Sequence, residues 1–123
     1  MITIHIIYDA NGEFFGFRSC GHAGYSKRGK DIVCAAVSAM SLNLINSTLE
    51  LTSQSLIYEL SEKDGLLRMK YEEPVLDDAK LLFNAFLIGL QETEKEYGSE
   101  YIKIVYVKKL SDHNYKIIDH QEV

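Results

Sequence analysis

This sequence of 123 residues has little cysteine and little proline, and each of these two shortages excludes a class of protein. Two cysteines are too few for the disulfide framework of a small secreted domain. A single proline and the lack of any low-complexity tract argue against a long linker or a disordered chain. With 46% hydrophobic residues, residues 1–123 are predicted to form one compact domain whose core needs no metal or disulfide.

Positive charge is also scarce, because 13 lysine and arginine residues stand against 18 aspartate and glutamate residues, a net charge of −5. That sign is wrong for a protein that mainly grips phosphate backbones, so direct nucleic-acid contact is not expected without a local basic patch. No apolar run approaches the roughly 18 residues that span a bilayer, and the alternating N-terminus does not resemble a secretory signal. We therefore expect a cytoplasmic protein with no membrane partner.

The hydrophobic periodicity predicts seven elements in the order ββαββαβ. Strands are expected at residues 2–8, 13–22, 55–62, 65–71 and 101–108, with hairpin turns at Asn11-Gly12 and Asp64-Gly65. This order predicts an α+β fold in which two helices pack against one mostly antiparallel sheet. The polar tail from about residue 110 has no predicted place in it.

The two expected helices differ in character. The first begins at Ile32 behind Asp31, which caps it, and it is apolar on nearly all sides, which predicts a central position. The second has Pro74 at its first position and ends at Gly98.

The second strand carries a cluster of aromatic side chains. Strand alternation places Phe15, Phe17 and Ser19 on one face and Phe14, Arg18, Cys20 and His22 on the other, with Gly16 as a candidate bulge. The three phenylalanines fit either an apolar groove or the core, and the core is the usual place for aromatic strand residues.

The chemistry is expected where the second strand meets the first helix. Cys34 falls in the first turn of the expected helix, where unpaired backbone N–H groups and the helix dipole stabilise a thiolate. His22, at the edge of the glycine-rich loop, is the candidate base for that thiol. Asp31 and Ser38 are supporting candidates, since Asp31 caps the helix and Ser38 lies one turn below Cys34 on the same face.

Spacing alone leaves other interpretations open. A cysteine in an alanine-rich helix is most often a packing residue, and Cys20, His22 and Cys34 together offer the three ligands of an open zinc site. The loop bases Lys27, Arg28 and Lys30 are either a solvated loop or a cluster that meets anions.

Two motifs closely resemble those of the ribosomal-processing cysteine protease family, often called Prp. They are Gly21-His22-Ala23 and Asp31-Ile32-Val33-Cys34-Ala35-Ala36-Val37-Ser38-Ala39. The resemblance runs from Met1 to about Lys108, and the polar tail beyond it is longer than the family usually carries.

This resemblance implies a cytoplasmic, homodimeric cysteine endopeptidase that removes the N-terminal extension of large-subunit ribosomal protein twenty-seven during ribosome assembly. His22 and Cys34 match the family's catalytic dyad, Gly21, Asp31 and Ser38 match positions near the site, and residues 23–30 match a flexible segment. The dyad would act through an acyl-enzyme with no metal or other cofactor, using N–H groups of the helix start, with that of Cys34 as a candidate, to hold the oxyanion. The alternative is a non-enzymatic ribosome-assembly or protein-binding factor whose cysteine is structural.

Overall fold

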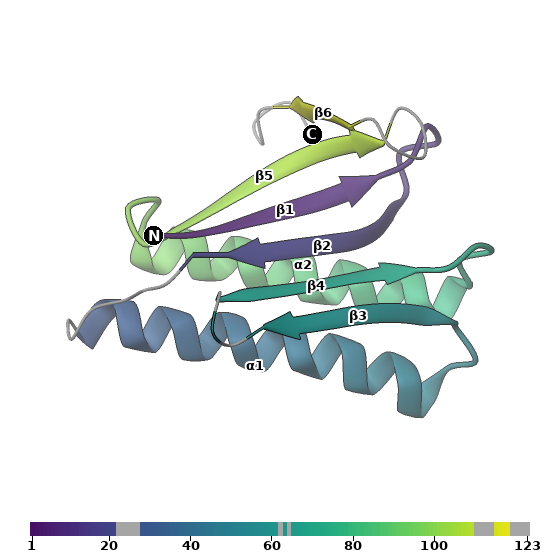
Figure 1. Ribbon diagram of the computed structural model, residues 1–123, viewed down its shortest axis with the longest axis horizontal. Helices are drawn as coiled ribbons and strands as arrows, with labels where there is room; N and C mark the ends of the chain where they lie inside the picture. The colour runs from purple at the N-terminus through teal and green to yellow at the C-terminus, as the bar shows by residue number, and fades with distance from the viewer. Residues whose placement is uncertain (22–27, 62, 64, 110–114, 119–123) are drawn as a thin grey trace.

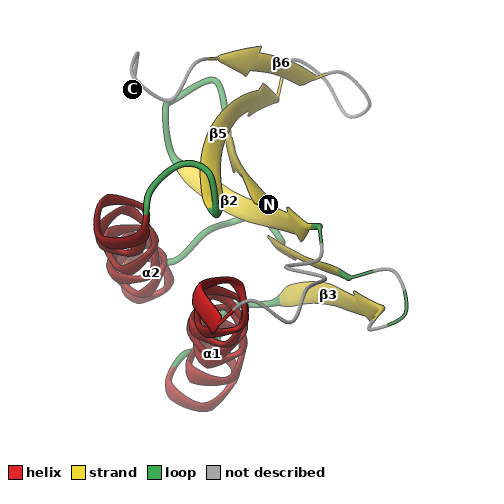
Figure 2. Cartoon of the chain, turned by 90° about the vertical axis from the view of Figure 1, so that its left-hand side faces the viewer, coloured by secondary structure: helices red, strands yellow, loops and turns green. Residues whose placement is uncertain are grey.

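A computed structural model of the chain describes residues 1–21, 28–61, 63, 65–109 and 115–118, with the side chains of 28–31 and 115–118 outside the description. Two helices lie on one face of a six-stranded sheet whose strand order is β3-β4-β2-β1-β5-β6 (Figure 1, Figure 2). The strands are β1 Ile2–Tyr8, β2 Phe14–Cys20, β3 Leu56–Ser61, β4 Leu66–Tyr71, β5 Ile102–Lys109 and β6 Tyr115–Ile118. The helices are α1 Arg28–Leu51 and α2 Asp77–Tyr97.

The expected α+β fold and the order ββαββαβ are confirmed over residues 1–109. The sheet is mixed, because β1 pairs with β5 in parallel while the other described pairings are antiparallel. An eighth element follows, since residues 115–118 of the tail form strand β6 along the outer edge of β5 (Figure 2). No structure was predicted for this part of the tail.

The predicted bulge in β2 is present and changes the faces of two phenylalanines. Ile7 pairs with Gly16 and Tyr8 pairs with Phe14, so Phe15 is the extra residue. Phe14 stacks on Phe83 of α2, whereas the ring of Phe15 lies under the ammonium group of Lys109 at 5.4 Å. The expectation that Phe15 and Phe17 lie on the same face of the sheet is therefore wrong.

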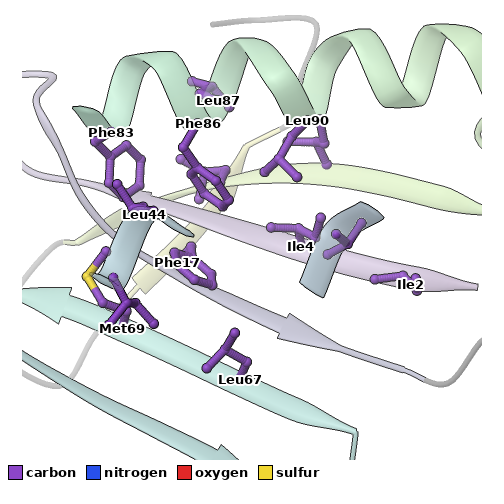
Figure 3. Close-up of a cluster of buried hydrophobic side chains, with 14 of the residues drawn as sticks. Ile2, Ile4, Phe17, Leu44, Leu67, Met69, Phe83, Phe86, Leu87 and Leu90 are labelled. Atoms are coloured by element: carbon purple, nitrogen blue, oxygen red, sulfur yellow. The ribbon is translucent and has the colours of Figure 1, made fainter. Parts of the chain in front are cut away.

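All three phenylalanines of β2 belong to the core, as favoured from the sequence, and Phe17 is almost fully buried. The ring of Phe17 packs against Phe86 with 4.9 Å between the ring centroids. Figure 3 shows the residues of β1, β2, β4, α1 and α2 that meet there, among them Ile4, Leu44, Met69 and Leu90. This cluster fixes the two helices against the sheet.

Helix α1 differs from its prediction in both its start and its burial. It begins at Arg28, so Asp31 lies inside the helix and does not cap it. Arginine and lysine favour helix, which lets the basic residues of the expected loop extend α1 backward by one turn. The helix is not central either, because Ile32 and Leu49 are each 51% exposed.

The expectation that no apolar run approaches the length of a membrane span is wrong for α1. Residues Ile32–Leu51 are long and apolar enough to cross a bilayer by length and composition, and a third of that stretch is buried. Core helices of soluble proteins meet the same criteria, so this is weak evidence for a membrane span. Val33, Val37, Leu44 and Ile45 of this stretch pack in the core.

Helix α2 begins at Asp77, so Pro74 precedes the helix and does not open it. The buried side chain of Gln54 holds the segment before α2: its amide nitrogen donates to the carbonyl oxygen of Glu72 at 2.7 Å, and its oxygen accepts from the N–H of Leu76 at 2.7 Å. Gly98 ends the helix, as predicted, with φ +97°.

Candidate active site

The candidate site is a cavity of about 220 Å³ between α1, the ends of β1 and β2, and the β3–β4 hairpin. Cys34, Ser38, Ser41 and Leu42 come to it from α1, and Gly21 comes from the end of β2. The opposite wall is formed by Leu60, Ser61, Gly65 and Leu66. The structure therefore brings together Gly21, Cys34 and Ser38, which the sequence analysis singled out.

Gly21 is required by the backbone at this point. Its φ is +106°, a region that residues with a Cβ rarely adopt. A Cβ built on Gly21 would also collide with the backbone carbonyl oxygen of Met1. Ile2 cannot easily give way, because its N–H donates to the carbonyl oxygen of Tyr101 at 2.9 Å. Glycine at this position thus allows the end of β2 to turn beside the start of β1.

Cys34 lies in the second turn of α1 and its side chain is partly exposed at the cavity. The first four N–H groups of an α-helix are the unpaired ones, and in α1 these belong to residues 28–31. The expected position of Cys34 in the first turn is therefore wrong. Its own N–H is directed to the carbonyl of residue 30 by the helical pattern, so it is not a free oxyanion donor in this helix.

Cys20 lies on the other side of the sheet from Cys34. It is the Cα partner of Thr3, one residue beyond Ser19, which is buried on the helix side and lines the cavity. Successive strand residues point to opposite faces, so Cys20 faces away from α1. The alternative zinc site that shares both thiols is not formed by this arrangement, and no cluster of three His, Cys, Asp or Glu side chains occurs among the residues that the structure describes.

Several predicted residues fall outside the described part of the chain. His22 and Lys27 are among them, as are the side chains of Arg28, Lys30 and Asp31. The catalytic role predicted for His22, the supporting role predicted for Asp31 near the site, and the predicted flexibility of residues 23–30 stay predictions.

A larger groove, of about 690 Å³, lies on the sheet face that the helices leave uncovered, opposite the face of Cys34. His5, Arg18 and Arg68 line it in adjacent strands. Burial, together with the nearby Arg18 guanidinium, lowers the pKa of His5. No described cysteine lines this groove, so the smaller cavity remains the candidate site.

Two features of the cavity were not predicted from the sequence: the wall formed by the β3–β4 hairpin, and the buried Ser41 that lines it. Ser41 is 1% exposed and its hydroxyl has no hydrogen-bond partner among the described residues. The sequence could have indicated that Ser41 lies on the same helix face as Cys34, because a spacing of seven residues is close to two helical turns. The hairpin wall gave no local signal, since β3 and β4 reach α1 only through the tertiary fold.

Comparison with known proteins finds similarity over most of the chain. The family model described as "Cysteine protease Prp" matches residues 1–103. A protein from Staphylococcus aureus named "Ribosomal processing cysteine protease Prp" is 31% identical over 106 residues, which cover 86% of this chain and 99% of that protein. Its counterpart in Bacillus subtilis is 26% identical over 85 residues, 66% of this chain and 76% of that protein.

A crystal structure of the S. aureus protease in complex with a substrate peptide has a TM-score of 0.80 and 30% identity, covering 86% of this chain and 99% of that one. A second structure of that protease, with a covalently linked product peptide, has a TM-score of 0.77 and 31% identity at the same coverage. Over most of its length, this chain therefore has a fold similar to that of a protease crystallised with a substrate peptide and with a covalently linked product peptide.

Proposed function

Because this chain belongs to the Prp family of cysteine proteases, we propose that it removes the N-terminal extension of large-subunit ribosomal protein twenty-seven, with Cys34 as nucleophile and His22 as base. The observation that carries the proposal is the cavity in which Cys34, Ser38 and Gly21 meet. Relatives named for ribosomal processing and the S. aureus structures with substrate and product peptides support it.

The proposed reaction is an acyl transfer in two halves. His22 takes the proton of the Cys34 thiol, and the thiolate attacks the carbonyl carbon of the scissile peptide bond. His22 then gives that proton to the leaving amine as the C–N bond breaks, leaving a thioester on Cys34. Water, deprotonated by His22, hydrolyses the thioester and releases the carboxylate, and the proton returns to the thiolate.

The oxyanion of each tetrahedral intermediate needs hydrogen-bond donors that are not already engaged. The unpaired N–H groups of α1 belong to residues 28–31, one turn before Cys34, so they replace the N–H of Cys34 as the proposed donors. The positive end of the helix dipole lies at the same turn and favours both the thiolate and the oxyanion.

The cavity walls fit an apolar peptide. Leu42, Leu60 and Leu66 line it together with small residues, and Leu42 and Leu60 are 37% and 49% exposed. A substrate with apolar side chains before the cut would cover these leucines and remove their apolar surface from water. We propose this cavity as the binding site for apolar side chains of the extension.

We also propose that the enzyme is cytoplasmic and forms a homodimer. Cys20 and Cys34 are free thiols, which suits a reducing compartment. Neither a metal nor an organic cofactor is required by the proposed steps, because the dyad contains its own base.

The proposal is tested by incubating the purified protein with a peptide that spans the extension and following the products by mass spectrometry. We expect one cut for the wild type and no cut for Cys34→Ala, which removes the nucleophile, or for His22→Ala, which removes the base. Both losses should be at least about a hundredfold. Lys103→Ala is the matched surface control, since Lys103 is exposed on β5.

A protein that cuts no extension peptide and whose Cys34 resists alkylation would contradict this proposal. That outcome would favour the alternative of a non-enzymatic ribosome-assembly or protein-binding factor with a structural cysteine.

A further inference from the structure

Strand β3 is an edge of the sheet whose side chains are mostly apolar and exposed. In the strand order it has β4 on one side and no described strand on the other (Figure 1). Ile57 is 56% exposed, Tyr58 is 55% exposed and Leu60 is 49% exposed. Soluble proteins usually protect an edge strand with lysine, proline or a bulge, because an unprotected edge pairs with another chain. The six residues Leu56–Ser61 contain none of these three protections.

The pairing with β4 determines which backbone groups of β3 point outward. The N–H of Glu72 donates to the carbonyl oxygen of Ser55 at 2.9 Å, so these two residues form a hydrogen-bonded pair of the antiparallel ladder. Hydrogen-bonded pairs alternate with non-hydrogen-bonded pairs along such a ladder, and the register is regular over the whole of β3. The N–H and C=O groups of Leu56, Tyr58 and Leu60 therefore point away from β4, toward the free edge.

The free edge of β3 leads to the candidate active site. Leu60, near the C-terminal end of β3, lines the cavity that contains Cys34. Tyr58 lies opposite Met69, which is buried in the core between the sheet and the helices. Directly opposite residues share a face of the sheet, and so do residues two apart in one strand. The side chains of Tyr58 and Leu60 are therefore on the same side of the sheet as the cavity.

An extended peptide is the partner that this edge fits. A strand added to a sheet edge gains affinity from main-chain hydrogen bonds and specificity from contacts of its alternate side chains. A helix cannot use the outward groups of β3, because its own backbone groups are already paired. The five residues from Leu56 to Leu60 span about 13 Å at 3.3 Å per residue, so the edge holds about five residues of an extended chain. Ile57 on one face and Tyr58 on the other favour apolar side chains in that chain.

We infer that the extension of the substrate binds as an added β-strand along the free edge of β3. The inference rests on the proposed function and describes how its substrate is held. The extension is the fragment before the cut, so its last residue lies at Cys34 and the residues preceding it lie along β3. Because β3 itself runs toward the cavity, the added strand is parallel to β3.

The first test uses extension peptides that are methylated at one backbone nitrogen at a time, on both sides of the cut. Each methyl group removes one N–H donor from the peptide and changes nothing in the protein. Fluorescence anisotropy gives the dissociation constants with Cys34→Ala, which cannot cut the peptides. We expect methylation of every second residue before the cut to raise the dissociation constant about tenfold, and methylation of the residues between them to change it less than about twofold. The residues between them are the matched control.

The second test removes a donor from the protein. Tyr58→Pro deletes the outward N–H of Tyr58, and proline is tolerated in an edge strand where the N–H faces away from the ladder. Tyr58→Ala is the matched control, because it loses the same side chain and keeps the N–H. We expect a KM for Tyr58→Pro about tenfold above that of Tyr58→Ala, with the same kcat, since the chemistry at Cys34 is untouched. Circular dichroism and thermal unfolding establish that both variants are folded.

Equal dissociation constants for all the methylated peptides, or equal KM values for folded Tyr58→Pro and Tyr58→Ala, would overturn the added strand. An alternating pattern found only after the cut would overturn the placement of the extension on β3. The methylated peptides decide the question without any change to β3. Peptides that are cut but show no alternation contradict only the added strand, whereas peptides that bind with the alternation and are never cut by the wild type contradict only the proposed peptidase. A protein that binds no extension peptide contradicts both.

Discussion

Replacing Gly21 with alanine should damage both the stability and the activity of this protein. Gly21 has φ +106°, and holding a residue with a Cβ in such a sparsely populated region costs about 1–3 kcal/mol. The added Cβ would also collide with the carbonyl oxygen of Met1, and overpacking of this kind costs about 1–3 kcal/mol more. We therefore expect Gly21→Ala to lower the free energy of unfolding by about 3 kcal/mol or more.

Gly12→Ala is the matched control for this prediction. Gly12 also has a positive φ, +79°, but nothing lies within 4 Å of the position of its Cβ. It should lose only the conformational part, about 1–2 kcal/mol. The difference between the losses of unfolding free energy in the two variants measures the energetic cost of placing a Cβ where the end of β2 approaches Met1.

The activity of Gly21→Ala should fall as well, because Gly21 lines the cavity that contains Cys34. A displacement of about 1 Å in a positioned site can cost about a hundredfold in rate, so we expect a loss of at least about tenfold. Urea unfolding gives the stability and cleavage of the extension peptide gives the rate. If Gly21→Ala were as stable and as active as Gly12→Ala, the structural explanation for this glycine would be refuted.

Three further results are expected. Alkylation at neutral pH should label Cys34 before Cys20, because Cys34 borders the cavity near the start of α1, and faster labelling of Cys20 would count against the nucleophile. Tyr71→Phe should cost about 1 kcal/mol in urea unfolding, since the buried hydroxyl of Tyr71 donates to the carbonyl oxygen of Ala79 at 3.1 Å; an unchanged midpoint would contradict that bond. The pKa of His5 is lowered, so the folded state binds the His5 proton more weakly than the unfolded chain does. Acidification from about pH 7 to about pH 5.5 should therefore reduce the free energy of unfolding less in His5→Gln than in the wild type. Equal losses in the two proteins would contradict this sign.

The strands could be predicted from the sequence because their signals are local. The alternation at residues 2–8 and 65–71 and the turn glycines Gly12 and Gly65 gave both hairpins within a residue or two of β1, β2, β3 and β4. The parallel pairing of β1 with β5 joins opposite ends of the chain, and no local pattern specifies it. Strand β6 was missed because its four residues lie within a polar tail.

Helix α1 shows where sequence reasoning failed. The glycine-rich stretch before it was interpreted as a loop up to Asp31, but the helix-forming arginine and lysine residues start α1 at Arg28. Its apolar residues were all assigned to the core, although a helix beside a sheet buries one face only. Apolar residues such as Ile32 are therefore exposed on the other face.

For the candidate site, the sequence supplied Cys34, Ser38 and Gly21, which share the cavity. It could not supply the wall of Leu60 and Leu66, because that wall depends on how the β3–β4 hairpin packs beside α1. Ser41 also lines the cavity, and its burial there could be recognised only in the structure.

The central claim is that Cys34 attacks the substrate and carries its N-terminal fragment as a thioester. The most direct measurement is rapid acid quenching of the wild-type protein with the extension peptide, followed by intact-protein and peptide mass spectrometry. We expect a transient mass increase equal to the acyl fragment, located on the peptide that contains Cys34 and absent from Cys34→Ala. An adduct on another residue, or cleavage by Cys34→Ala at the wild-type rate in a preparation free of host protease, would contradict the account.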